Sequence, residues 1–74
     1  MEKGTVTHFY EDKGYGFILA DLENEPYPKQ IFFHVTEFQG TPKVGAKVQF
    51  KIMINNRNVM AAYEVTDADK LQRL

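Results

Sequence analysis

The sequence predicts a small all-β protein, a five-stranded barrel that is closed or partly open. Two observations predict this class. Five short segments carry the β-branched and aromatic residues of strands, and glycine, proline or asparagine separates them. No internal segment resembles a convincing helix, and a chain of 74 residues can form only one small domain. Closure of the sheet suits so small a domain because it removes exposed strand edges.

The first two strands are expected over residues 3–10 and 15–20, joined by the turn signal Glu11-Asp12-Lys13-Gly14. Residues 21–30 contain two prolines among clustered polar residues, which is typical of a loop. Tyr27 in this loop either packs over the barrel, the interpretation we favour, or serves as a further stacking ring. A first hairpin followed by an irregular loop is therefore predicted.

Residues 31–35 form a short apolar run that predicts the third strand. Alternation puts Phe32 and His34 on one face, and the aliphatic bulk of Ile31, Phe33 and Val35 marks the other face as the inner one. One helical turn capped by Thr36 is expected over residues 36–38.

The clearest alternation in the sequence begins at Lys47 and predicts a half-buried fourth strand. Its inner residues should be Val48, Phe50, Ile52 and Ile54. Residues 55–58 supply a turn, and Val59, Ala61, Tyr63 and Val65 carry the return strand. Residues 67–74 favour helix but are too few for a stable isolated one, so they form a frayed tail or the start of a linker into further sequence.

The segment Lys13-Gly14-Tyr15-Gly16-Phe17-Ile18 is the most informative for function. In an extended chain Lys13, Tyr15 and Phe17 share one face and Ile18 points to the other. If the face with the rings is exposed, Ile18 enters the core and bases can stack on the rings. The alternative is that both aromatics belong to the core beside a lysine whose charged end reaches water. We favour the exposed arrangement.

Composition and charge exclude several classes of protein. There is no cysteine, so disulfides and thiolate metal sites are excluded, and no long apolar run or secretory signal is present. We therefore expect a soluble cytoplasmic domain without a cofactor. Neither a phosphate-binding glycine loop nor a nucleophile with a base beside it is recognisable, so an enzyme is not expected. His34 has no second ligand at a recognisable spacing, so no metal site is expected.

The net charge of −1 argues against a protein that wraps duplex DNA, which usually presents a basic surface. It is compatible with binding to single strands, because stacking on aromatic rings contributes about 1–3 kcal/mol per base. Aromatic residues make up 14% of the chain, enough to supply such rings.

Two motifs resemble the ribonucleoprotein motifs of the cold-shock domain family. Residues 13–18, KGYGFI, are similar to the first motif and residues 31–35, IFFHV, to the second, in the same order. The resemblance covers residues 3–66, within an expected domain of residues 1–66. It implies an oligonucleotide/oligosaccharide-binding (OB) barrel of five antiparallel strands. It also implies that Tyr15, Phe17, Phe32 and His34 contact bases and that Lys13 contacts phosphate.

Three positions in the first strand depart from the family pattern, while Phe9 matches it. Thr7-His8-Phe9-Tyr10 stands where the family usually has Lys-Trp-Phe-Asn. His8 is therefore either a smaller stacking platform or a surface histidine. Phe9 is either a ring at the edge of the site, which we favour, or a core residue, since only a bulge could expose both Phe9 and His8.

These features together predict a monomeric module that binds single-stranded DNA or RNA with little sequence specificity. Binding by stacking would keep a nucleic acid single-stranded, as a chaperone does. The alternative is a protein-interaction barrel that retains the fold while its nucleic-acid face has weakened. Three observations support that alternative: the family's rings are missing at His8 and at Val35, where the family's second motif ends in His-Phe, the net charge is negative, and the tail can lead into further sequence.

Overall fold

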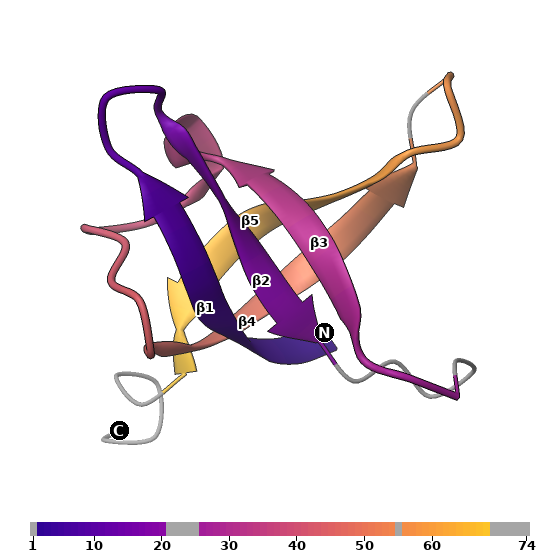
Figure 1. Ribbon diagram of the computed structural model, residues 1–74, viewed down its shortest axis with the longest axis horizontal. Coiled ribbons are helices and arrows are strands. Elements are labelled where there is room, and N and C mark those ends of the chain that lie inside the picture. Colours follow the sequence, from indigo (N-terminus) through magenta and orange to yellow (C-terminus); the bar gives the residue numbers. More distant parts are fainter. Residues whose placement is uncertain (1, 21–25, 55, 69–74) are drawn as a thin grey trace.

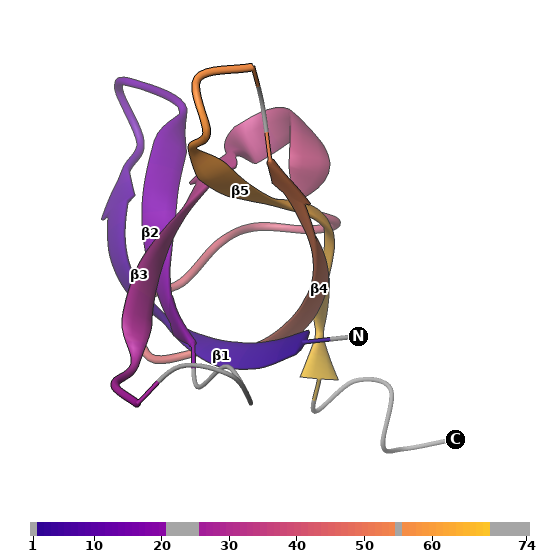
Figure 2. The same ribbon diagram turned by 90° about the vertical axis from the view of Figure 1, so that its right-hand side faces the viewer.

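The computed structural model describes residues 2–20, 26–54 and 56–68, and it is a closed five-stranded barrel. The all-β fold class is confirmed. The strand order around the barrel is β1-β2-β3-β5-β4 (Figures 1 and 2). Of the tail expected over residues 67–74, Asp67 belongs to the last strand, and residues 69–74 lie outside the described residues, as do residues 21–25. The elements are β1 (Glu2–Tyr10), β2 (Tyr15–Ala20), β3 (Lys29–His34), the 3₁₀ turn η1 (Val35–Glu37), β4 (Lys47–Ile54) and β5 (Met60–Asp67).

One strand pair is parallel, which corrects the expectation of a wholly antiparallel barrel. β1 pairs antiparallel with β2 and β4, β2 with β3, and β4 with β5, whereas β3 and β5 are parallel. The reason is geometric. Five strands in a ring cannot alternate direction at every contact, so at least one neighbouring pair must run the same way.

The barrel core is formed by the inner faces of all five strands. Ile18, Ile31, Phe33, Val48 and Phe50 are each at most 1% exposed, which confirms the predicted inner faces of β2 and β3 and of the first half of β4. The buried cluster consists of Val6, Ile18, Ala20, Ile31, Phe33, Val48, Phe50, Ala62 and Val65.

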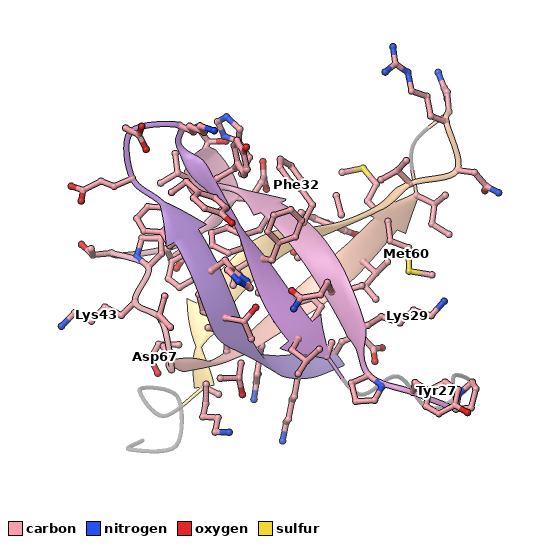
Figure 3. The ribbon with its side chains drawn as sticks, in the orientation of Figure 1. Tyr27, Lys29, Phe32, Lys43, Met60 and Asp67 are labelled. Atoms are coloured by element: carbon pink, nitrogen blue, oxygen red, sulfur yellow. The ribbon has the colours of Figure 1, made fainter. Side chains whose placement is uncertain are left out.

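Two expectations about apolar side chains are wrong. Ile54 is 55% exposed, because the end of β4 extends past the barrel into a projecting hairpin where no opposite wall covers it (Figure 1). Tyr27 is 75% exposed and points away from the barrel instead of packing over it (Figure 3). Alternation predicts which way a side chain points, but not where the barrel ends.

Irregularities in β4 and β5 shape the second half of the barrel. The register between these strands shifts between Gln49 and Lys51, and Glu64 has a positive φ of 51°. In a regular strand, residues three positions apart point to opposite faces. Because of these irregularities, Ala62 and Val65 both point into the core. Lys51 Nζ lies 2.8 Å from Glu64 Oε2, and the hydrogen bond with this carboxylate raises the pKa of Lys51.

The expected helical turn after β3 is present but begins one residue earlier, and its cap differs. η1 covers Val35–Glu37, and the residue that caps it is His34 rather than Thr36. His34 Nδ1 accepts a hydrogen bond from the Thr36 backbone N–H at 3.2 Å and lies 2.8 Å from Thr36 Oγ1. The cap fixes the orientation of the His34 ring at the end of β3.

Replacing Phe50 by alanine should destabilise the fold strongly. Phe50 is fully buried, and removing a buried phenylalanine side chain costs about 3–5 kcal/mol, enough to unfold so small a domain. Thermal melting of Phe50→Ala checks this, with Val44→Ala, at a position that is 64% exposed, as the control. An unchanged melting temperature for Phe50→Ala would contradict the inner face assigned to β4.

Candidate nucleic-acid interface

The bulge at Thr7 in β1 places His8 and Tyr10 on the outer face of the barrel. Val6 pairs with Ile18 and His8 with Phe17, so Thr7 is an extra residue without a partner in β2. A residue inserted in this way reverses the alternation that follows it. Val6 is buried, whereas His8 and Tyr10 are exposed.

Six rings form two rows across the outer face of β1, β2 and β3. In one row His8 pairs with Phe17 and Phe17 pairs with Phe32. In the other row Tyr10 pairs with Tyr15 and Tyr15 pairs with His34. Paired residues on neighbouring strands point to the same side of a sheet. We call this set the aromatic face: His8, Tyr10, Tyr15, Phe17, Phe32 and His34.

Phe17 is the central ring of the aromatic face. Its centroid lies 6.3 Å from His8, 6.3 Å from Tyr15 and 6.1 Å from Phe32, and each of these pairs meets edge to face. Such pairs contribute about 0.5–1.5 kcal/mol each beyond the area they bury. The rings therefore hold one another in place before any ligand arrives.

Tyr15 connects the two rows of the aromatic face. Its centroid lies 5.5 Å from Tyr10 in its own row and 5.4 Å from Phe32 in the other. Because neighbouring rings cover part of their surface, Tyr15, Phe17 and Phe32 are half-buried and not open to solvent as the sequence suggested for Phe17 and Phe32. Their outward direction agrees with the predicted alternation. Phe32 lies over the front of the barrel in Figure 3.

Lys13 lies beside the aromatic face, but it does so from a turn and not from a strand as expected. It lies in the turn before β2, where Gly14 has a positive φ of 75°, so strand alternation does not apply to it. Its Nζ nevertheless lies 5.9 Å from the centroid of the Tyr10 ring. A cation over a tyrosine ring is attracted by the π electrons. Lys13 therefore adds positive charge at the edge of the aromatic face.

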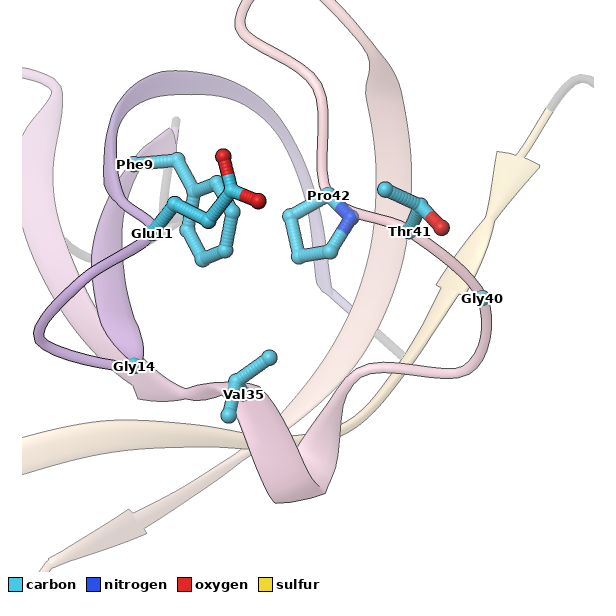
Figure 4. Close-up of a pocket in the computed structure, with 7 residues that line it drawn as sticks. All are labelled: Phe9, Glu11, Gly14, Val35, Gly40, Thr41 and Pro42. Carbon is cyan, nitrogen blue, oxygen red and sulfur yellow. The ribbon is translucent and has the colours of Figure 1, made fainter.

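The structure does not bring Phe9 together with the other candidate residues. Its ring points inward and stacks on Phe33, with centroids 6.3 Å apart and an interplanar angle of 14°. It lines a separate cleft of about 340 Å³ between the β1–β2 turn and the segment after η1 (Figure 4). The bulge comes before both residues, so it does not expose His8 and Phe9 together, and it turns them to opposite faces. The cleft residues are Phe9, Glu11, Gly14, Val35, Gly40, Thr41 and Pro42.

Sequence reasoning missed one residue of the aromatic face, Tyr10, and one residue at its border, Gln30. Tyr10 belongs to the face because it lies two positions after His8, a spacing that could have identified it once His8 was a candidate. Gln30 borders an open hollow of about 290 Å³ whose other walls are His8, Tyr10 and Phe17. The Thr7 hydroxyl donates to Gln30 Oε1 at 3.0 Å and lies 3.1 Å from His8 Nδ1. These contacts orient two polar groups at the hollow.

Other kinds of site find no support in the part of the chain that the structure describes. Within residues 2–20, 26–54 and 56–68, no three acidic or histidine side chains gather as a metal site would require. The same residues include no helix of the length and apolar character needed to cross a membrane.

A closed five-stranded barrel with rings on one outer face places the chain among the small OB-like barrels. The family model described as "'Cold-shock' DNA-binding domain" matches residues 2–68, and the chain therefore belongs to the cold-shock domain family. Members of this family generally bind nucleic acids.

Relatives and a solved structure agree with this assignment. The chain is 36% identical over 66 residues to cold shock protein CspB of Bacillus caldolyticus, covering 84% of this chain and 92% of that protein. It is 35% identical over 63 residues to a cold shock-like protein of Aquifex aeolicus (strain VF5), covering 80% and 84% respectively. The structure of Drosophila Unr CSD456 superposes with a TM-score of 0.66 at 25% identity. That match covers 89% of this chain and spans about a quarter of the longer one, 26%.

Replacing Gly16 by alanine should destabilise the barrel beneath the aromatic face. Gly16 lies between Phe9 and Phe33 in the inner row, and a Cβ there would meet the Phe33 ring at 2.8 Å and the His8 carbonyl oxygen. Overpacking of this kind costs about 1–3 kcal/mol. Chemical denaturation of Gly16→Ala measures the loss. A variant as stable as the parent would mean that β1 and β2 can separate without cost.

Proposed function

We propose that the chain binds single-stranded DNA or RNA by stacking bases on the aromatic face. The observation that carries the proposal is the two rows of three rings on three neighbouring strands, all outside the core. A duplex hides its base faces within its own stack, whereas a single strand offers them to the protein. The ligand that fits this face is therefore a single strand.

The mechanism follows from the mutual contacts of the rings. Because Phe17 touches three neighbouring rings, it loses little freedom when a base covers it, and less binding energy is spent on ordering the site. Every base has a π face, so stacking tolerates any sequence. Lys13 beside Tyr10 is placed to meet a phosphate of the same strand.

The biological consequence of this binding is to keep a nucleic acid unpaired. A base stacked on protein cannot stack in a helix, so bound segments resist pairing, as under a chaperone. The chain acts in this account as a binding module and not as an enzyme, in keeping with its membership of a nucleic-acid-binding domain family.

Replacing Phe17 or Phe32 by alanine tests the proposal directly. Each change should weaken binding to an oligothymidine by about 1–3 kcal/mol through loss of stacking. Phe32→Ala loses two ring contacts and Phe17→Ala loses three, so the loss of stability should be about 1–3 kcal/mol for Phe32→Ala and up to about 4.5 kcal/mol for Phe17→Ala. Fluorescence titration and thermal melting on the same variants measure both effects.

Phe32→Tyr is the matched control, since it keeps a ring at the same position and should bind as the parent does. Alanine variants that bind like the parent but melt far earlier would assign these rings to stability alone. That result would favour a protein-interaction barrel.

Binding should depend only modestly on salt. If Lys13 and one or two further cations such as Lys3 or Arg57 each neutralise a phosphate, the log–log slope for a single strand is about −1.4 to −2. Titrations of an oligothymidine at several concentrations of sodium chloride give this slope. A slope several times steeper would mean that phosphate contacts dominate over stacking.

A further inference from the structure

One row of the aromatic face continues onto the far strands of the barrel. Phe32 in β3 pairs with Ala61 in β5, and Ala61 pairs with Met53 in β4. The neighbouring pair of Phe33 and Ala62 is buried, so Phe32 and Ala61 point outward, and Met53 opposite Ala61 does the same. The row therefore runs from the rings onto an apolar surface of a different kind.

The shape of this surface suits a flat apolar group. Met53 is 53% exposed, and Ala61 between it and Phe32 carries only a methyl group. With a strand spacing of about 4.8 Å, the Cα atoms of Phe32 and Met53 are roughly 10 Å apart. The surface is lower over Ala61 and rises to an aromatic ring on one side and a thioether on the other. Sulfur of methionine makes favourable contacts with aromatic rings.

We propose that Ala61 and Met53 form an additional base subsite that receives the nucleotide following the one on Phe32. This inference rests on the proposed function, because it extends the path of the same strand. The barrel wall turns at β5 (Figure 2), so the nucleic acid must bend between the two positions. A single strand bends at this scale, whereas a duplex has a persistence length of about 150 base pairs.

A docked protein fits this part of the surface less well. The exposed apolar residues of the β4–β5 hairpin are Met53, Ile54 and Val59. Met53 and Ile54 are successive residues of a strand and point to opposite faces, so they do not join into one patch. A stable protein interface buries about 800 Å² on each partner, far more than one methionine and one alanine provide.

The experiment follows the ε-methyl groups of methionine by NMR during titration with octathymidine. The Met53 methyl should shift upfield under the ring current of a bound base, while the methyl of Met60, which packs against the core, should move little. Met53→Ala should weaken octathymidine binding by about threefold to tenfold, the loss of roughly one contact. Tetrathymidine, short enough to lie on the rings alone, should bind Met53→Ala and the parent equally.

Val44→Ala is the control, because Val44 is 64% exposed and lies next to Lys43, across the molecule from the hairpin (Figure 3). It should bind octathymidine as the parent does. Ala61→Val, which fills the low position, should reproduce the loss seen with Met53→Ala. Because Val44, Met53 and Ala61 all lie outside the buried core, melting curves are expected to show all three variants folded.

The outcomes separate the two proposals. If ring residues shift on titration while the Met53 methyl does not, the subsite is refuted and the proposed function stands. If neither the ring residues nor the Met53 methyl shifts at the highest oligothymidine concentration, the proposed function itself fails. If sedimentation shows that the parent self-associates and Met53→Ala does not, the surface belongs to a second copy of the chain, which overturns the subsite.

Discussion

The unpaired Thr7 in β1 is the feature on which both faces of the barrel depend. Without an inserted residue, the alternation that buries Val6 would bury His8 and Tyr10 and expose Phe9. The bulge reverses this pattern after Val6. Phe9 then stacks on Phe33 inside, and two rings join the four on β2 and β3 outside. One extra residue therefore supplies a core contact and a third of the aromatic face together.

The inner row beneath the rings shows why glycine separates the aromatics of β2. Phe9, Gly16 and Phe33 are neighbours across three strands, and a Cβ at position 16 would meet the Phe33 ring and the backbone carbonyl oxygen of His8. Any side chain at position 16 would therefore displace the Phe33 ring or the β1 backbone. Because Tyr15 and Phe17 flank Gly16 and point outward, the same packing sets the spacing of the outer rings. Core and candidate site are thus two sides of one strand, and a change on one side affects the other.

Much of the fold could be predicted because alternation in β2, β3 and the first half of β4 is regular. Ile18, Ile31 and Phe33 follow the two-residue period, and their inward direction correctly sends Phe17 and Phe32 outward. The errors occur where the period breaks or the barrel ends. Thr7 gives no sequence signal of a bulge, so the inward direction of Phe9 could not be predicted and Phe9 was expected at the site.

Other features needed the closed barrel before they could be understood. Ile54 continues the alternation of β4, yet it lies beyond the wall that would cover it. Lys13 was expected on the face of a strand, but the strand begins two residues later. The parallel pairing of β3 and β5, by contrast, follows from an odd number of strands and could have been predicted once a closed barrel of five was assumed.

The distribution of charge explains why rings and not cations should dominate recognition. Lys51 pairs with Glu64 on the far side of the sheet, and Lys47 Nζ donates to Thr5 Oγ1 at 3.1 Å. Lys13 is the cation that the structure places directly over a ring of the aromatic face. If the chain binds single strands as proposed, this surface would attract a polyanion weakly from a distance and hold it mainly through contact with its bases. Such contact is open only to unpaired bases, so under the proposed function the accessibility of the base is the basis of selection and duplexes are disfavoured.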